Sequence, residues 1–81
     1  MPETGSEEEF DGKDKLMIPG MVNTHTHVPM TLLRGYGENL PLDRWLNERI
    51  FPYEHQLDAD SVYDASLLGI AEMLMFGVTS F

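Results

Sequence analysis

Two histidines separated by one threonine, His25-Thr26-His27, have the residue types and spacing best suited to chemistry in this sequence. Alternate side chains of a β-strand point to the same face, so imidazoles at this spacing stand about 6 to 7 Å apart on one side of the chain. Neutral imidazole is a good ligand for zinc, iron and cobalt. We therefore predict that His25 and His27 bind one divalent metal ion, Zn²⁺ or another such as Fe²⁺. The alternative for so short a motif is a pair of polar residues at a strand edge.

Glu54 is a second candidate, because a carboxylate can accept hydrogen bonds from two neighbouring hydroxyls of a bound sugar. It follows Pro52 in a predicted linker between two helices, where most glutamates are only solvated. The spacing of Trp45 favours a packing residue over a stacking platform. Asn23 shares the predicted face of the two histidines, and we expect it to satisfy backbone groups.

An extended segment must position the histidines. The apolar run LMI at residues 16–18 and the segment MVNTHTHV are separated by Pro19-Gly20, which predicts strand, turn and strand. The period of two selects the residues on one face of the second strand, which are Met21, Asn23, His25 and His27. Pro29 ends this strand, and a long loop with a helical turn is expected to follow.

Two helices and a strand are predicted after the loop. An apolar stripe indicates a short helix over residues 42–50 that Pro52 stops. Asp58 is placed to cap a second helix, which runs to a stop at Gly77 and is apolar almost all round. Residues 78–81 are β-prone, so the whole reads as one βαβ unit of an α/β fold with a parallel sheet.

Composition limits the partners. Fourteen acidic against five basic residues give a net charge of −9, which disfavours binding to nucleic acid and to anionic membranes. The sequence contains no cysteine, no apolar run of membrane-spanning length and no signal-peptide pattern at its start, so we expect a cytoplasmic protein. Residues 1–15 are predicted to be a flexible acidic tail, and residues 16–81 the structured part.

A family resemblance rests on longer motifs. LMIPGMVNTHTHVPMTLLRGYGENLPLDRWLNERIFPYE and DASLLGIAEMLMFGVTSF resemble the first strand, loop and helix of the amidohydrolase superfamily, through the motif PG-x-x-N-T-H-T-H. PMTLLRG and LDRWLNERIFPYE are similar to the 5-methylthioadenosine/S-adenosylhomocysteine deaminases and their chlorohydrolase relatives. The resemblance covers residues 11–81.

The resemblance implies a (β/α)8 TIM-like barrel, of which this chain is the first βαβ unit, and metal-dependent hydrolytic deamination of methylthioadenosine-like or adenosylhomocysteine-like nucleosides. It implies that His25 and His27 are the first two metal ligands, that Glu54 holds the ribose, and that Trp45 lies near the pocket. No catalytic residue is expected in this chain, because the family takes its remaining ligands and its acid-base glutamate from later strands. A homo-oligomeric complete enzyme is compatible with the resemblance.

Two alternatives stay open. Another superfamily member, such as a guanine deaminase or a triazine hydrolase, would keep the histidines without needing a ribose-binding carboxylate. The other alternative is an inactive truncated fragment. The chain has 81 residues, whereas such barrels usually need about 250, and two imidazoles leave a tetrahedral metal half-coordinated.

Overall fold

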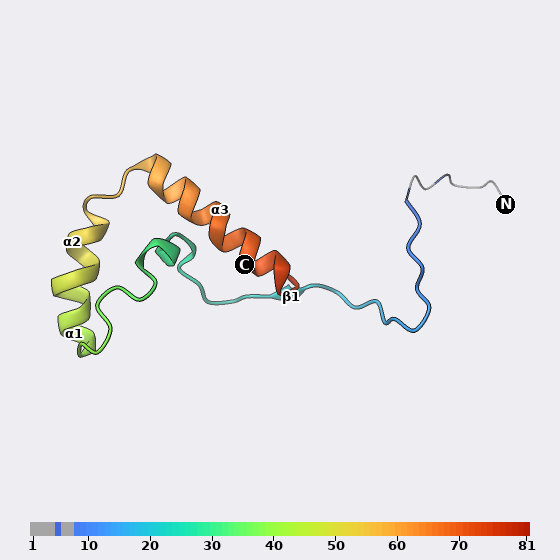
Figure 1. Cartoon of the computed structure of the whole chain (residues 1–81), viewed down its shortest axis with the longest axis horizontal. Helices are drawn as coiled ribbons and strands as arrows, with labels where there is room; N and C mark the ends of the chain where they lie inside the picture. The colour runs from blue at the N-terminus through green and yellow to red at the C-terminus, as the bar shows by residue number, and fades with distance from the viewer. Residues whose placement is uncertain (1–4, 6–7) are drawn as a thin grey trace.

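The computed structural model describes residue 5 and residues 8–81. An extended amino-terminal stretch leads to a small sheet, and the helices lie beyond it (Figure 1). In chain order the elements are β1 (Met21–Val22), the 3-10 helix η1 (Val28–Leu33), α1 (Leu42–Trp45), the π-helix η2 (Leu46–Ile50), α2 (Phe51–Glu54), α3 (Ala59–Met75) and β2 (Val78–Ser80). Residues 1–4 and 6–7 of the predicted tail lie outside the described part, and residues 8–15 form only one turn. The flexibility of the tail stays a prediction.

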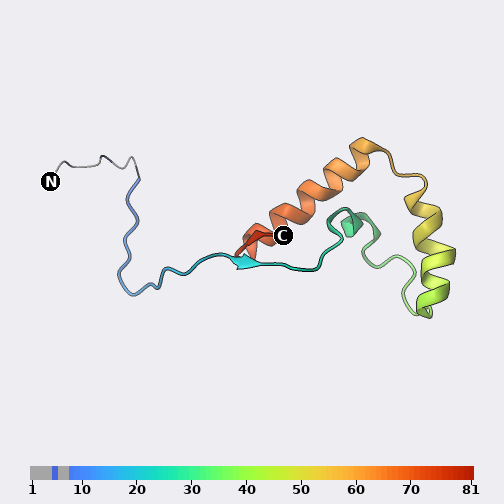
Figure 2. The ribbon, with the colours of Figure 1, turned by 180° about the vertical axis from the view of Figure 1, so that it is seen from behind.

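The sheet has two parallel strands, as the predicted βαβ unit requires. Met21 pairs with Val78, and the Asn23 amide donates to the Ser80 carbonyl at 2.9 Å. Figure 2 shows β1 and β2 meeting at the end of α3, far along the chain from each other in sequence. The chain is therefore an α/β structure with a small parallel sheet.

The strand is shorter than predicted. No strand forms over residues 16–18 or 23–27, and only Met21–Val22 is assigned. A strand needs a hydrogen-bonded neighbour, and β2 supplies three residues that reach only as far as Asn23. The segment carrying the histidines is thus extended chain just beyond the carboxyl end of β1.

Both predicted boundaries of the long helix, α3, are confirmed. The Asp58 carboxylate accepts hydrogen bonds from the Ser61 hydroxyl at 2.6 Å and the Ser61 amide at 2.8 Å, which caps the amino-terminal end. These hydrogen bonds hold the pKa of Asp58 below its usual value. At the other end Gly77 takes a φ of +80°, and its amide donates to the Leu74 carbonyl.

The prediction that Pro52 ends the first helix is wrong. Elements α1, η2 and α2 follow one another without a break from Leu42 to Glu54, and we call this continuous unit the helical rod. Its middle turn is a π turn, in which the Phe51 amide donates to the Leu46 carbonyl five residues earlier. In a regular α-helix the Pro52 ring would clash with a carbonyl four residues before it, and the wider turn avoids that clash.

Few apolar side chains are buried. Only Leu33, Ile50 and Ala65 are buried hydrophobic residues within the described part of the chain. The radius of gyration is 19.4 Å, against about 12 Å for a compact domain of this length, and the amino-terminal stretch that extends away from the helices contributes to this value (Figure 1). Most apolar side chains of α3 are exposed, including Tyr63, Leu74 and Met75. The helices therefore enclose little core, and α3, predicted to be apolar almost all round, keeps many apolar side chains on its surface. Among the described residues, no helix has both the length and the apolarity to cross a membrane.

The Gly77→Ala substitution tests the carboxyl-terminal end of α3. A Cβ there would meet only ordinary van der Waals contact, so its cost comes from the positive φ. We expect a loss of about 1 to 2 kcal/mol in the stability of the helix, seen as a lower midpoint of thermal melting by circular dichroism. Gly12→Ala is the control, since a Cβ at Gly12 meets nothing within 4 Å. Equal melting of both variants and the unsubstituted chain would contradict the assignment.

The Asp58 cap predicts a pH dependence. Because the folded pKa of Asp58 is lowered from 3.8, its contribution to helix stability is fully present above that ordinary value. The contribution is lost as pH falls through the lowered pKa. We expect Asp58→Asn, which keeps a good cap without a titrating group, to reduce the acid-induced loss of helical circular dichroism between pH 5 and pH 2, an interval of about three units around the carboxyl range. Identical acid titrations of the two chains would contradict this role.

Candidate metal centre

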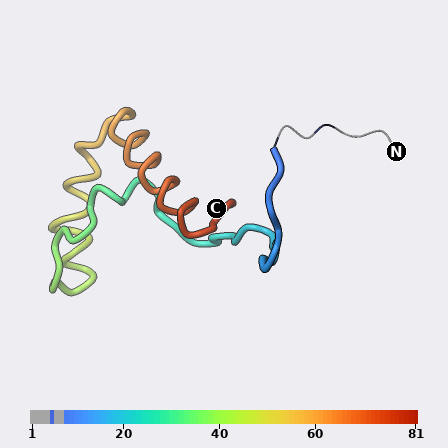
Figure 3. The backbone as a smooth tube through the Cα atoms, turned by 45° about the vertical axis from the view of Figure 1, so that its right-hand side comes forward, coloured from blue at the N-terminus to red at the C-terminus, as the bar shows by residue number. Residues whose placement is uncertain are grey.

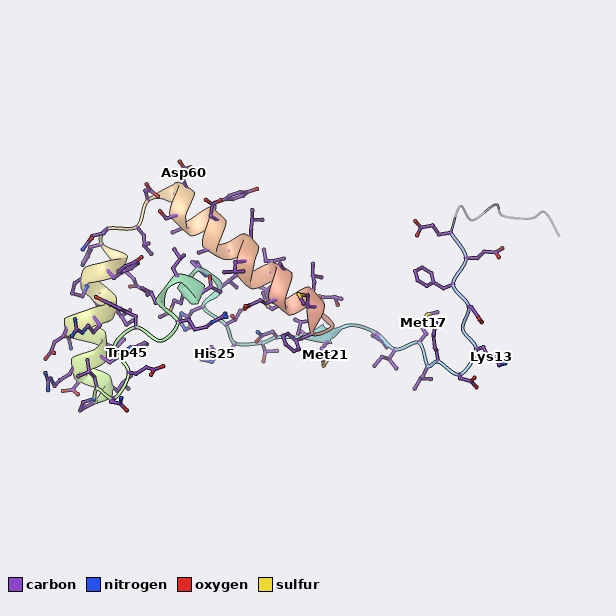
Figure 4. All side chains as sticks on the ribbon, viewed as in Figure 1. Lys13, Met17, Met21, His25, Trp45 and Asp60 are labelled. Carbon is purple, nitrogen blue, oxygen red and sulfur yellow. The ribbon has the colours of Figure 1, made fainter. Side chains whose placement is uncertain are left out.

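The structure brings the two histidine rings together. Their centroids are 5.5 Å apart with an interplanar angle of 53°, and both residues are exposed. Figure 4 labels His25 on the stretch between β1 and η1. The Asn23 side-chain oxygen accepts a hydrogen bond from the His25 amide at 3.1 Å, so Asn23 satisfies a backbone group as expected. This bond holds the chain in place immediately before the pair.

The ring separation suits a shared metal ion. With Zn–N bonds of about 2.0 to 2.1 Å and ring centres about 1.1 Å beyond each nitrogen, two tetrahedrally arranged imidazoles have centroids about 5.2 Å apart. The observed 5.5 Å differs from this by a few tenths of an ångström. Among the described residues no third histidine, aspartate or glutamate joins the pair to form a metal-binding group. The pair therefore offers two ligands, and their role as ligands stays a prediction.

His27 immediately precedes the next element, η1. It has φ −117° and ψ 74°, and its carbonyl accepts a hydrogen bond from the Met30 amide at 2.9 Å. Pro29 lies in the first turn, where its fixed φ favours helical geometry. The direction of His27 thus depends on how η1 is packed.

Glu54 lies on the same concavity as His27. This concavity, which we call the His27–Glu54 concavity, has a volume of about 330 Å³ and is lined by His27, Pro29, Met30, Leu33, Glu54, Leu57 and Val62. Within the described residues no hydrogen bond or ion pair engages the Glu54 carboxylate, which is exposed. The concavity is therefore lined by one imidazole, one carboxylate free to accept hydrogen bonds and five apolar side chains.

The predicted location of Glu54 in a linker is wrong, because it is the last residue of α2. The π turn of η2 explains its direction. An i→i+5 turn contains one residue more than an α-helical turn, so it shifts the face on which every later residue lies. Regular α-helical hydrogen bonding resumes after Pro52, where the His55 amide donates to the Phe51 carbonyl at 3.1 Å.

Trp45 packs against the loop before the helical rod, as its spacing predicted. Its Nε1 donates a hydrogen bond to the Tyr36 carbonyl at 2.9 Å, and the residue is half-buried. The Tyr36 ring lies 5.7 Å from the Tyr53 ring, and the Arg49 guanidinium lies 5.8 Å from the Tyr36 ring centroid. Figure 4 labels Trp45 on the rod. These contacts hold the rod against the loop that follows η1. His55 is exposed.

One ion pair was not foreseen from the sequence. Both guanidinium nitrogens of Arg34 donate to the Glu72 carboxylate, at 2.8 and 2.6 Å. The hydrogen bonds and opposite charge of Arg34 lower the pKa of Glu72, and Glu72 raises the pKa of Arg34. The partners lie 38 residues apart, so no local spacing signals the pair.

Comparison with known proteins points to one family. The model of the amidohydrolase family matches residues 16–81. Over 72 residues the chain is 56% identical to a 5-methylthioadenosine/S-adenosylhomocysteine deaminase of Dictyoglomus thermophilum, covering 89% of this chain and 17% of the relative. It is 58% identical over 72 residues to a 5'-deoxyadenosine deaminase of Methanothermobacter thermautotrophicus, with the same coverage.

A third relative, a 5-methylthioadenosine/S-adenosylhomocysteine deaminase of Halalkalibacterium halodurans, is 47% identical over 74 residues, which is 91% of this chain and 17% of the relative. The chain thus spans about 17% of the length of these curated relatives. No solved structure matches the chain.

Histidine substitutions test the metal pair. We expect His25→Ala and His27→Ala each to weaken Zn²⁺ or Co²⁺ binding by more than the roughly tenfold typical of losing an outer partner, because each removes a direct ligand. Isothermal titration of the 81-residue chain measures the change. His55→Ala is the matched control, since His55 lies outside the pair and is exposed. Equal weakening by all three substitutions would show unspecific imidazole binding instead.

Proposed function

The chain belongs to the amidohydrolase family, and on that basis we propose that it forms part of a metal-dependent enzyme that deaminates adenosine-type nucleosides by hydrolysis. In this proposal His25 and His27 bind a divalent ion, Zn²⁺ or a similar metal such as Fe²⁺, and Glu54 binds the ribose. The observation that carries the proposal is the His27–Glu54 concavity, whose lining combines an imidazole, an unpaired carboxylate and apolar side chains.

The substrate class comes from the names of the relatives. Methylthioadenosine, adenosylhomocysteine and 5'-deoxyadenosine are all adenine nucleosides altered at the 5' carbon. What they share is adenine and a ribose with two neighbouring hydroxyls. A carboxylate only accepts hydrogen bonds and has two oxygens, which suits a pair of neighbouring hydroxyl donors. Glu54 would therefore recognise the part of the substrate that is common to the class.

The wall of the concavity favours the same class. Pro29, Met30 and Leu33 from η1 line it together with Leu57 and Val62, and none of these side chains is charged. An apolar wall with a few polar groups is typical of small-molecule sites. It suits the uncharged rings of a nucleoside better than a phosphorylated substrate.

The described residues bind and orient rather than transfer protons. A divalent ion held by His25 and His27 supplies Lewis-acid chemistry, which makes water a stronger nucleophile near neutral pH. Glu54 fixes the sugar, and the apolar wall excludes water from the nucleoside. We assign no catalytic acid or base to this chain.

We further propose that the β-α-β arrangement is one repeat of a (β/α)8 barrel. The histidines follow the carboxyl end of β1, and active sites of such barrels are formed at the carboxyl ends of the strands. The exposed apolar side chains of α3 support this proposal, because a barrel helix is covered by its neighbours.

A chimeric enzyme tests the ribose role of Glu54. The 72 matched residues of this chain would replace the corresponding segment of the Dictyoglomus thermophilum relative, and ammonia release from methylthioadenosine would be followed. We expect the chimera to be active. Glu54→Gln should raise KM by about tenfold or more, as for a lost charge-assisted hydrogen bond, with a smaller change in kcat.

Glu48→Gln is the matched control, because Glu48 lies on the same helical rod, outside the His27–Glu54 concavity, and pairs with Arg44 on the surface. A 2'-deoxy analogue should lose most of its sensitivity to the Glu54 substitution. If KM for the ribonucleoside is unchanged in Glu54→Gln, the ribose role of Glu54 is wrong. A folded, metal-loaded chimera that leaves adenosine-type substrates intact would refute the deaminase proposal itself.

A further inference from the structure

We propose that Gly69, Arg34 and Glu72 are positioning residues that hold η1 against α3 and thereby set the place of His27 relative to Glu54. The inference rests on the proposed metal role of His27. These three residues are absent from the lining of the His27–Glu54 concavity, and they line a neighbouring concavity that His27 also borders. Figures 2 and 3 show the stretch containing η1 running beside α3.

The closest approach of the two helices is at Gly69. A Cβ built on Gly69 would lie 2.8 Å from Val28 Cγ1 and 3.1 Å from the Val28 carbonyl oxygen. Gly69 is buried in the middle of α3, where glycine lowers helix stability by about 1 kcal/mol relative to alanine. The missing side chain is therefore unfavourable for α3 by itself and is explained by the space that Val28 occupies.

Two polar contacts also join η1 to α3. The Thr31 hydroxyl donates to the Ala65 carbonyl at 2.8 Å, in a half-buried position. Arg34 forms the two-armed ion pair with Glu72 one turn further along. The exposed fractions of these two side chains are 63% and 38%, so the pair contributes little stability but defines a direction through its planar geometry.

The contacting residues share one face on each helix. Val28, Thr31 and Arg34 are three residues apart, which is the repeat of a 3-10 helix. Their partners Ala65, Gly69 and Glu72 are spaced by four and three residues, which places them on one face of an α-helix. The residues that line these contacts form a continuous seam between η1 and α3.

The remaining residues of η1 include three that line the His27–Glu54 concavity. Pro29, Met30 and Leu33 lie between the seam residues in sequence and line the His27–Glu54 concavity. A shift of η1 away from α3 therefore moves that wall, and it also moves His27, which directly precedes η1. The seam acts on the site through η1.

Gly69→Ala separates positioning from helix stability. Alanine favours the helix, so the circular dichroism of α3 should be retained or increased. The added methyl group should displace η1, and we expect Zn²⁺ or Co²⁺ affinity of the 81-residue chain to fall by about tenfold, as for lost outer-shell support. The backbone amide signal of His27 should shift in NMR spectra without metal. Gly12→Ala is the control, with open space around its Cβ.

Two further variants sharpen the test. Val28→Ala in the Gly69→Ala background removes the Cγ1 clash and should restore most of the affinity. Glu72→Gln should weaken metal binding more than Asp64→Asn, which removes the same charge from the same helix at a residue without an ion pair in the described part of the chain.

The outcomes distinguish this inference from the proposed function. Metal binding by the unsubstituted chain, with unchanged affinity and an unchanged His27 signal in Gly69→Ala, would overturn the positioning inference alone. Failure of the folded chimera with the Dictyoglomus thermophilum relative to bind metal through His25 and His27 would overturn the proposed function. If the 81-residue chain alone binds no metal, an unshifted His27 signal in metal-free Gly69→Ala would overturn the seam as well, and a shifted signal would support it.

Discussion

Parallel strands cannot be joined by a tight turn, and this constraint determines where most of the chain lies. After the carboxyl end of β1, the chain must return to the opposite end of the sheet before β2 can run parallel to β1. Helix α3 makes this return. Everything from His25 to Leu57 is consequently placed between the end of β1 and the start of α3. The histidines occupy the carboxyl end of the strand because of that topology. The 3-10 helix η1 that follows them packs against α3.

The packing of η1 against α3 brings the histidine pair close to Glu54, which lies far from it in sequence. His25 and His27 are near each other because of their spacing, and this needs no tertiary contact. Glu54 comes near His27 only because η1 is held on α3 and the helical rod is held against the loop by Trp45 and Tyr53. The histidine pair and its closeness to Glu54 thus have different physical origins.

The small core gives these contacts added weight. With only Leu33, Ile50 and Ala65 buried among the hydrophobic residues described, hydrophobic burial specifies few of the relative positions. Three contacts fix the position of η1 on α3 instead. They are the close approach at Gly69, the half-buried hydrogen bond from the Thr31 hydroxyl, and the Arg34–Glu72 ion pair. The exposed apolar side chains of α3 and the 17% coverage of the relatives both fit a unit that packs within a longer amidohydrolase.

The sequence by itself determined the features that depend on neighbouring residues. The cap at Asp58, the stop at Gly77, the facing histidines and the family were all predicted, because each rests on local backbone preferences or on contiguous motifs. Tertiary structure decided the rest. The strand is short because strand length depends on a partner, and the rod continues past Pro52 because a π turn accommodates the ring. Glu54 and the Arg34–Glu72 pair were placed by contacts between distant segments, whose geometry no local pattern encodes.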